Sequence, residues 1–140
     1  MQQSEPIPPI RTRGLSKRFG RMVALDRLDL DVGAGEIVCL LGANGAGKTT
    51  TLNLLLGFLL PDGGEALVIG REVAADPAAA RAALGYVPEI VSLYPSLTGA
   101  ENLAFFHALS GRPELDAQAR DRLLASLDFP LAAIDRPVAG

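Results

Sequence analysis

The chain has 140 residues, enough for one domain with a hydrophobic core and too few for two domains of ordinary size. Apolar residues make up 49% of the sequence, a share that excludes a chain disordered over most of its length. The net charge of −3 comes without a basic stripe, so we expect no nucleic acid as the main partner.

The N-terminal segment, the apolar runs and the single cysteine bear on the cellular compartment of the chain. Residues 1–9 are expected to form a loose tail, with three prolines and no apolar segment of the kind found in signal peptides. The longest strongly apolar run, residues 52–60, is far shorter than the ~20 residues of a membrane helix. Cys39 lies in an apolar run and is expected to pack in the core. We therefore expect a cytoplasmic chain that reaches a membrane only through a partner.

The first half of the chain predicts strands around one helix. Residues 28–32 alternate between apolar and acidic side chains, as a half-exposed strand does. Residues 37–41 are apolar without alternation, which is typical of a strand buried on both faces. A helix is expected over residues 49–60, ending at the turn sequence 61–64, followed by a short strand over residues 66–69.

Helical patterns dominate the second half. Asp76 followed by Pro77 predicts the start of a short helix that runs through Leu84. Residues 86–87 are expected to form another buried strand. Thr98 and Glu101 form a capping-box pattern at the start of a helix, and a second amphipathic helix is expected over residues 115–127.

We divide the chain into three segments on this basis. Residues 1–9 are the tail, residues 10–89 form a core that contains the glycine-rich segment 42–49, and residues 90–140 form part of a helical subdomain.

One segment carries recognisable chemistry. Residues 42–49 read GANGAGKT and match the phosphate-binding loop pattern GxxxxGK[ST]. Glycines allow successive backbone N–H groups to turn toward one anion, and the following helix directs its positive end to the same place. Lys48 can reach the β and γ phosphates, and the Thr49 hydroxyl can bind magnesium. The predicted nucleotide-binding residues are Gly42, Ala43, Asn44, Gly45, Ala46, Gly47, Lys48, Thr49 and Thr50.

The alternative is an ordinary glycine-rich turn between a strand and a helix. It is disfavoured because the pattern follows an apolar run and opens a helix, as the chemistry requires.

Seven short segments follow one another in a recognisable order: residues 17–20 (KRFG), 24–26 (ALD), 35–37 (GEI), 42–50 (GANGAGKTT), 61–64 (PDGG), 85–89 (GYVPE) and 97–103 (LTGAENL). In this order and spacing they resemble the ATPase domains of the ABC superfamily over residues 10–140. The sequence of residues 86–102 is most similar to the ATPase subunits of multidrug, antibiotic or sodium exporters.

The resemblance implies an α/β fold: a P-loop NTPase core with an antiparallel β subdomain at the N-terminus and the start of a helical subdomain, truncated. It also implies that Phe19 stacks on the adenine of ATP, the alternative being an aromatic side chain of a small core beside a turn. It implies that Glu89 binds magnesium where the family has glutamine, the alternative being a solvated loop glutamate. The implied partners are transmembrane permease subunits and a second nucleotide-binding domain in a head-to-tail dimer.

The sequence lacks three further elements of such a site, namely the LSGGQ signature, a strand that ends in Asp-Glu and a switch histidine. Residues 109–111 (LSG) and 124–128 (LASLD) resemble the first two only superficially. Residues 136–140 resemble the segment that precedes the signature. No catalytic residue is therefore assigned, and we expect poor folding alone and no hydrolysis by this chain.

The preferred function is that of the ATP-binding subunit of an ABC transporter, which couples ATP binding and hydrolysis to transport. Two alternatives remain open: a soluble ABC ATPase of repair or translation, and a nucleotide-binding fragment without catalysis.

Overall fold

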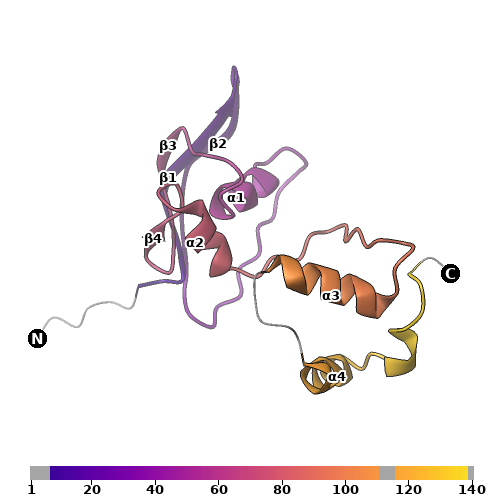
Figure 1. Ribbon diagram of the computed structural model, residues 1–140. Helices are drawn as coiled ribbons and strands as arrows, with labels where there is room; N and C mark the ends of the chain where they lie inside the picture. Colours follow the sequence, from indigo (N-terminus) through magenta and orange to yellow (C-terminus); the bar gives the residue numbers. More distant parts are fainter. Residues whose placement is uncertain (1–6, 111–115, 139–140) are drawn as a thin grey trace, which may run out of the picture. The chain divides into compact units, whose positions relative to one another are not determined.

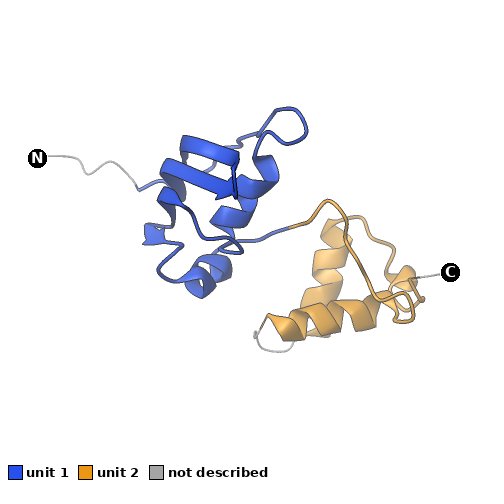
Figure 2. Ribbon diagram, turned by 90° about the horizontal axis from the view of Figure 1, so that it is seen from above, with its two compact units in different colours: residues 1–86 blue, residues 87–140 orange. Residues whose placement is uncertain are grey.

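The computed structural model describes residues 7–110 and 116–138, and the chain divides into two compact units, residues 1–86 and 87–140 (Figures 1 and 2). Unit 1 contains a four-stranded antiparallel sheet with the order β2-β1-β3-β4. The four strands are β1 (Ile10–Phe19), β2 (Met22–Val32), β3 (Gly63–Val68) and β4 (Arg71–Glu72).

Strand β1 was not expected from the sequence, and an irregularity in it explains why. Its two fully buried side chains, Thr12 and Leu15, are three residues apart, because the pairing with β2 shifts register between them. Gly14 lies in this irregular stretch with φ of +55°, and its N–H donates to Asp29 Oδ1 at 2.6 Å. A bulge of this kind breaks the period of two by which a strand is recognised.

The hydrophobic core of unit 1 lies between the sheet and two helices, α1 (Lys48–Leu55) and α2 (Pro77–Ala82) (Figure 1). Burial of one leucine side chain stabilises a fold by about 1.5–3 kcal/mol, so these few residues dominate the stability of the unit. The buried cluster consists of Leu15, Leu54, Leu55, Ala66, Val68, Val73 and Ala80.

The helix that follows the phosphate loop is shorter than expected. It ends at Leu55, because Gly57 adopts φ of +66° and turns the chain, well before the turn sequence 61–64. The start of α2 is as predicted, with the Asp76 side chain accepting a hydrogen bond from the N–H of Ala79 and Pro77 at the first helical position.

The two predictions of buried strands are wrong for the structure. Residues 37–41 form no strand, Ile37 and Leu41 are 96% and 87% exposed, and Cys39 is exposed rather than in the core. Residues 86–87 likewise form no strand and are exposed. No strand among the described residues pairs with either segment, and an apolar strand without neighbours gains neither hydrogen bonds nor burial.

Unit 2 contains the helices α3 (Gly99–Leu109) and α4 (Ala117–Ser126) and a short 3-10 turn at Leu131–Ala133 (Figure 2). The predicted capping box is present, since Thr98 Oγ1 accepts from Glu101 N and Glu101 Oε2 accepts from Thr98 N. Residue 115, where the second helix was expected to begin, lies outside the described residues, as do residues 111 and 139–140.

A buried asparagine holds the segment before α3. Asn102 accepts a hydrogen bond from Tyr94 N and donates to the carbonyls of Tyr94, Leu97 and Thr98.

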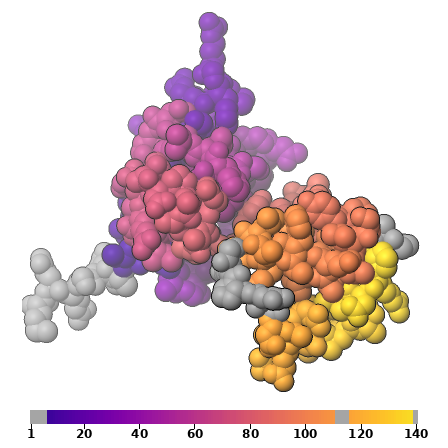
Figure 3. Space-filling model, in the orientation of Figure 1, coloured from indigo at the N-terminus to yellow at the C-terminus, as the bar shows by residue number. Residues whose placement is uncertain are grey.

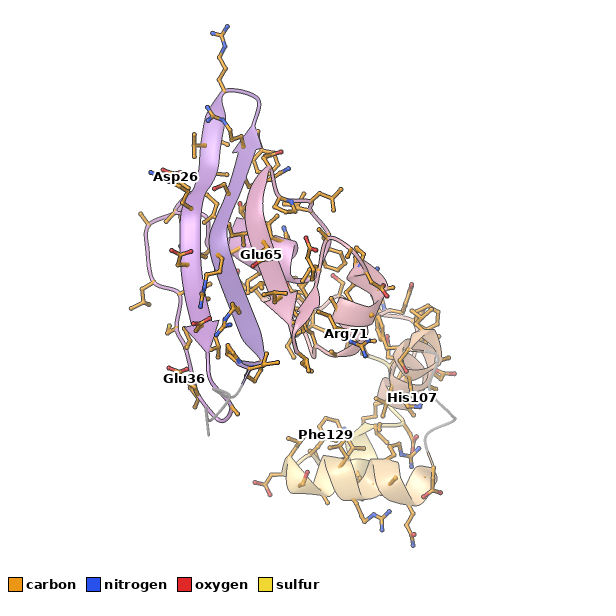
Figure 4. The ribbon with its side chains drawn as sticks, turned by 90° about the vertical axis from the view of Figure 1, so that its left-hand side faces the viewer. Asp26, Glu36, Glu65, Arg71, His107 and Phe129 are labelled. Carbon is orange, nitrogen blue, oxygen red and sulfur yellow. The ribbon has the colours of Figure 1, made fainter. Side chains whose placement is uncertain are left out.

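The helices leave a cavity of about 370 Å³, whose lining includes Phe129, labelled in Figure 4. Its other lining residues are Leu93, Gly99, Leu103, Leu124, Ala133, Ile134, Arg136, Pro137 and Val138.

Candidate nucleotide-binding site

The loop at residues 42–47 leads directly into α1, and the conformation of its last residue leaves the helix end open. Gly47 is the N-cap residue, in the left-handed region with φ of +85°, and no side chain caps the helix. The first N–H groups of a helix have no partner within the helix, and together with the helix dipole they attract an anion. The start of α1 therefore presents backbone N–H donors to an anion that binds beside the loop.

Two glycines of the loop fit only because they lack a side chain. A Cβ on Gly47 would lie 2.5 Å from the carbonyl oxygen of Ala24 in β2, and one on Gly42 would lie 2.9 Å from Ala46 Cβ. Gly45 also has a positive φ, of +84°, but a Cβ added there would meet nothing within 4 Å. The loop thus packs on β2 at one end and is open at its tip.

The Lys48 side chain bridges from the helix start to the beginning of the loop. Its Nζ donates to the carbonyl oxygens of Gly42 at 2.7 Å and Ala43 at 2.8 Å. An ammonium group has three protons, so one donor remains for a phosphate oxygen. The buried Thr51 fixes the other side of the turn, since its hydroxyl and its N–H both donate to Gly47 O. Thr49 is exposed and Thr50 is half-buried at the helix start.

The contact with β2 places the loop near the turn end of the β1–β2 hairpin. Gly47 meets the carbonyl of Ala24, which lies between Val23, paired with Arg18, and Leu25, paired with Lys17. Phe19 is the next residue of β1 and is 44% exposed. At about 3.3 Å per residue along a strand, Phe19 and the loop share the same end of the hairpin. This end protrudes from unit 1 (Figure 3).

The opposite end of the hairpin is where the chain leaves β2 toward the loop. Asp26 lies toward the turn end of β2, whereas Glu36 lies past its other end (Figure 4). Glu36 Oε2 accepts a hydrogen bond from Gly33 N at 2.7 Å, which forms the turn at the start of the exposed segment 37–41.

The two predicted magnesium ligands belong to different units of the chain. Thr49 lies at the loop in unit 1, whereas Glu89 belongs to unit 2 and is exposed. Among residues 7–110 and 116–138, no group of three His, Cys, Asp or Glu side chains is arranged to hold a metal ion. Within unit 1, Thr49 is therefore the one predicted ligand at the loop.

Asp62 makes two contacts with residues of β1 next to Phe19, and the sequence did not indicate them. Asp62, interpreted as a turn residue, accepts a hydrogen bond from the backbone N–H of Arg18 at 2.7 Å, and Lys17 Nζ lies 3.3 Å from its carboxylate. The hydrogen bond from Arg18 N lowers the pKa of Asp62, and Lys17 lowers it further. Acidic residues are common in turns, so the sequence offered no signal that would separate Asp62 from the rest.

The model of the family described as ABC transporter matches residues 25–138. The chain therefore belongs to the ABC transporter family. No helix in the described part of the chain is long and apolar enough to cross a membrane.

Curated relatives carry related names. The chain is 43% identical over 102 residues to the probable multidrug ABC transporter ATP-binding protein YbhF of Escherichia coli K12, covering 73% of this chain and 18% of that protein. It is 39% identical over 125 residues to the daunorubicin/doxorubicin resistance ATP-binding protein DrrA of Streptomyces peucetius, covering 89% and 37%. These names confirm the expected similarity to the ATPase subunits of exporters, although the chain spans well under half of each relative.

Solved structures confirm the fold class. An ATP-binding subunit of an ABC transporter superposes with a TM-score of 0.74 at 27% identity, covering 91% of this chain and 53% of that chain. The ATP-binding cassette MJ0796, described as a dimer in a post-hydrolysis state bound to ADP and Pi, gives 0.71 at 23% identity, covering 91% and 61%. The fold is thus that of part of an ABC ATPase domain, with its antiparallel β subdomain and the beginning of a helical one.

Proposed function

We propose that this chain binds the phosphates of Mg-ATP at residues 42–50 and supplies the ATP-binding part of an ABC transporter. The observation that carries the proposal is the uncapped start of α1 next to a glycine loop that Lys48 bridges. Donors, dipole and ammonium converge on one exposed place, which is the chemistry that a polyphosphate needs.

The base and the metal complete the proposed site. We assign Phe19 to stacking on adenine, because it is exposed at the hairpin end against which the loop packs. Magnesium, when bound, neutralises charge on the β and γ phosphates. The Thr49 hydroxyl fits this role, since it is exposed at the helix start. Glu89 remains a proposed magnesium ligand.

The proposed partners are permease subunits in a membrane and a second nucleotide-binding domain, with the protein located at the cytoplasmic face. An exposed aromatic cluster in unit 2 supports a protein partner, because aromatic side chains are enriched at interfaces. Phe105 packs edge-on against Tyr94 and Phe106, with ring centroids 4.9 and 5.5 Å apart, and all three rings remain partly exposed. Copurification of membrane subunits with this protein would separate this role from that of a soluble ABC ATPase.

Calorimetry tests the phosphate site. Lys48→Ala is expected to weaken Mg-ATP binding at least about tenfold, because it removes the only side-chain cation of the loop. The matched control is Arg21→Ala, which removes an exposed cation from the hairpin turn. Unchanged affinity in a folded Lys48→Ala variant refutes the assignment.

A second candidate function is nucleotide binding without catalysis, because the proposed site residues of this chain bind the phosphates, the base and magnesium and none is assigned to catalysis. Phosphate release from Mg-ATP by this chain is then expected to equal that of its Lys48→Ala variant. A rate that depends on Lys48 shows instead that the chain hydrolyses ATP.

A further inference from the structure

The end of β1 extends past its neighbour β3. The pairing of β1 with β3 stops at Ser16 and Gly63, yet β1 continues for three residues to Phe19. On the other side Phe19 pairs with Met22 of β2 at the hairpin turn. The last residues of β1 would therefore be held on one side only, as in a two-stranded ribbon, which is marginally stable by itself.

Asp62 supplies the missing side. Its backbone N–H donates to Ser16 O at 3.0 Å, and its Oδ2 accepts from Arg18 N at 2.7 Å. The carboxylate thus replaces the next backbone carbonyl that β3 would have offered. A hydrogen bond to an ionised acceptor is stronger than one between neutral groups.

Lys17 links this contact to the aromatic ring. Its side chain is only 14% exposed, and its Nζ donates to Leu60 O at 2.7 Å besides pairing with Asp62. The same Nζ lies 5.8 Å from the centroid of the Phe19 ring, within the range of a cation–π contact. The ammonium is therefore fixed on two sides, by the turn at residues 60–62 and by the ring.

We propose that Asp62, acting through Arg18 N and Lys17, is a positioning residue that holds Phe19 in place for the base of the bound nucleotide. This inference rests on the proposed stacking role of Phe19. Asp62 itself is assigned no contact with phosphate or base. Its loss should therefore weaken the binding of ligands that carry a base and spare those that carry phosphates alone.

Calorimetry with two ligands tests the proposal. Phe19→Ala should weaken Mg-ATP by about fivefold or more and leave tripolyphosphate nearly unchanged, since base stacking on an aromatic ring is lost. Asp62→Ala should weaken Mg-ATP by about threefold with tripolyphosphate again unchanged, a fraction of the loss from removing the ring itself. Asp62→Asn should restore most of the affinity, because its amide oxygen still accepts from Arg18 N.

The matched control is Asp29→Ala. Asp29 also accepts a hydrogen bond from a backbone N–H of β1, that of Gly14, but at the bulge, five residues from Phe19. It should change neither ligand's affinity. Equal losses of both ligands in Asp62→Ala, or no loss of ATP, overturn the proposal.

Amide hydrogen exchange separates this inference from the role of Phe19. Asp62→Ala should accelerate exchange at the Arg18 amide by about tenfold or more and leave Gly14 protected, whereas Asp29→Ala should do the reverse. If exchange behaves in this way but Phe19→Ala spares ATP binding, the base-stacking role is wrong. If Arg18 exchange is unchanged in Asp62→Ala, the positioning contact itself is wrong.

Discussion

Two segments with apolar side chains flank the phosphate loop, and one buries these side chains whereas the other exposes them. On the far side, α1 buries Leu54 and Leu55 against the sheet. On the near side, residues 37–41 are all apolar in sequence, yet Ile37 and Leu41 are almost fully exposed. The difference is the presence of a partner: α1 packs against the sheet, and the near segment pairs with no described strand.

The comparison shows that an apolar segment becomes buried only where neighbouring segments provide a surface or strands to pair with. A helix satisfies its backbone hydrogen bonds internally, so α1 needs only one surface to cover. A strand must find hydrogen-bond partners beside it, so residues 37–41 depend entirely on other segments.

The largest expected effect contrasts two leucines on the two flanks. Leu54→Ala should lower the free energy of unfolding of unit 1 by about 2–5 kcal/mol, because it leaves a cavity in the core. Leu41→Ala should change it by less than about 0.5 kcal/mol, since that side chain is 87% exposed. Urea unfolding followed by circular dichroism measures both. Comparable losses would mean that residues 37–41 are packed in solution.

An intermediate effect contrasts two glycines within the loop. Gly47→Ala should destabilise unit 1 by about 2–4 kcal/mol, because the new Cβ would overlap the Ala24 carbonyl of β2. Gly45→Ala should cost about 1–2 kcal/mol, the strain of the left-handed conformation alone, since nothing lies near its Cβ position. Thermal unfolding of the two variants ranks them. The reverse ranking would show that the loop does not rest on β2.

The smallest effect concerns the exposed ion pairs between Asp31 of β2 and two arginines of β1. The hydrogen bonds from Arg13 and then Arg11 hold the pKa of Asp31 below its ordinary value. A lowered pKa in the folded state adds stability that is complete above the unfolded pKa of about 3.9 and is lost as the pH falls through the folded value. The stability difference between the unchanged protein and Asp31→Asn should thus shrink as the pH falls from about 6 to about 3.

The control for this comparison is Asp26→Asn. Asp26 Oδ1 lies 3.5 Å from Nε of its neighbour Arg27, and both side chains are mostly exposed. A difference in stability that stays constant with pH in Asp31→Asn would show that the pair with Arg13 and Arg11 does not form in solution.

Local sequence signals predicted the features that depend on local contacts. The caps at Asp76 and Thr98 were confirmed, because a cap involves residues within one helical turn. The strand over residues 28–32 is present as the end of β2, where alternation is regular. The short strand before Ile69 is also present, although Ile69 itself lies in the turn with φ of +48°.

The missed strands depend on distant partners, whereas the early end of α1 at Leu55 follows from the local turn at Gly57. Strand β1 was hidden by its bulge, and residues 37–41 were assigned a burial that requires neighbours. For the site, the sequence predicted the loop residues 42–50 and Phe19, whose roles remain proposals. It offered no indication of the contacts of Asp62, whose partners Lys17 and Arg18 lie more than 40 residues away in the chain.

The central claim is that the loop between these two flanks holds the phosphates. A titration with tripolyphosphate followed by amide NMR shifts tests it most directly, because the N–H groups at the start of α1 would become donors to the ligand. We expect the largest shifts at Gly45, Gly47, Lys48 and Thr49, and their loss in Lys48→Ala. Saturable shifts confined to other residues, with those four unmoved, would contradict the claim.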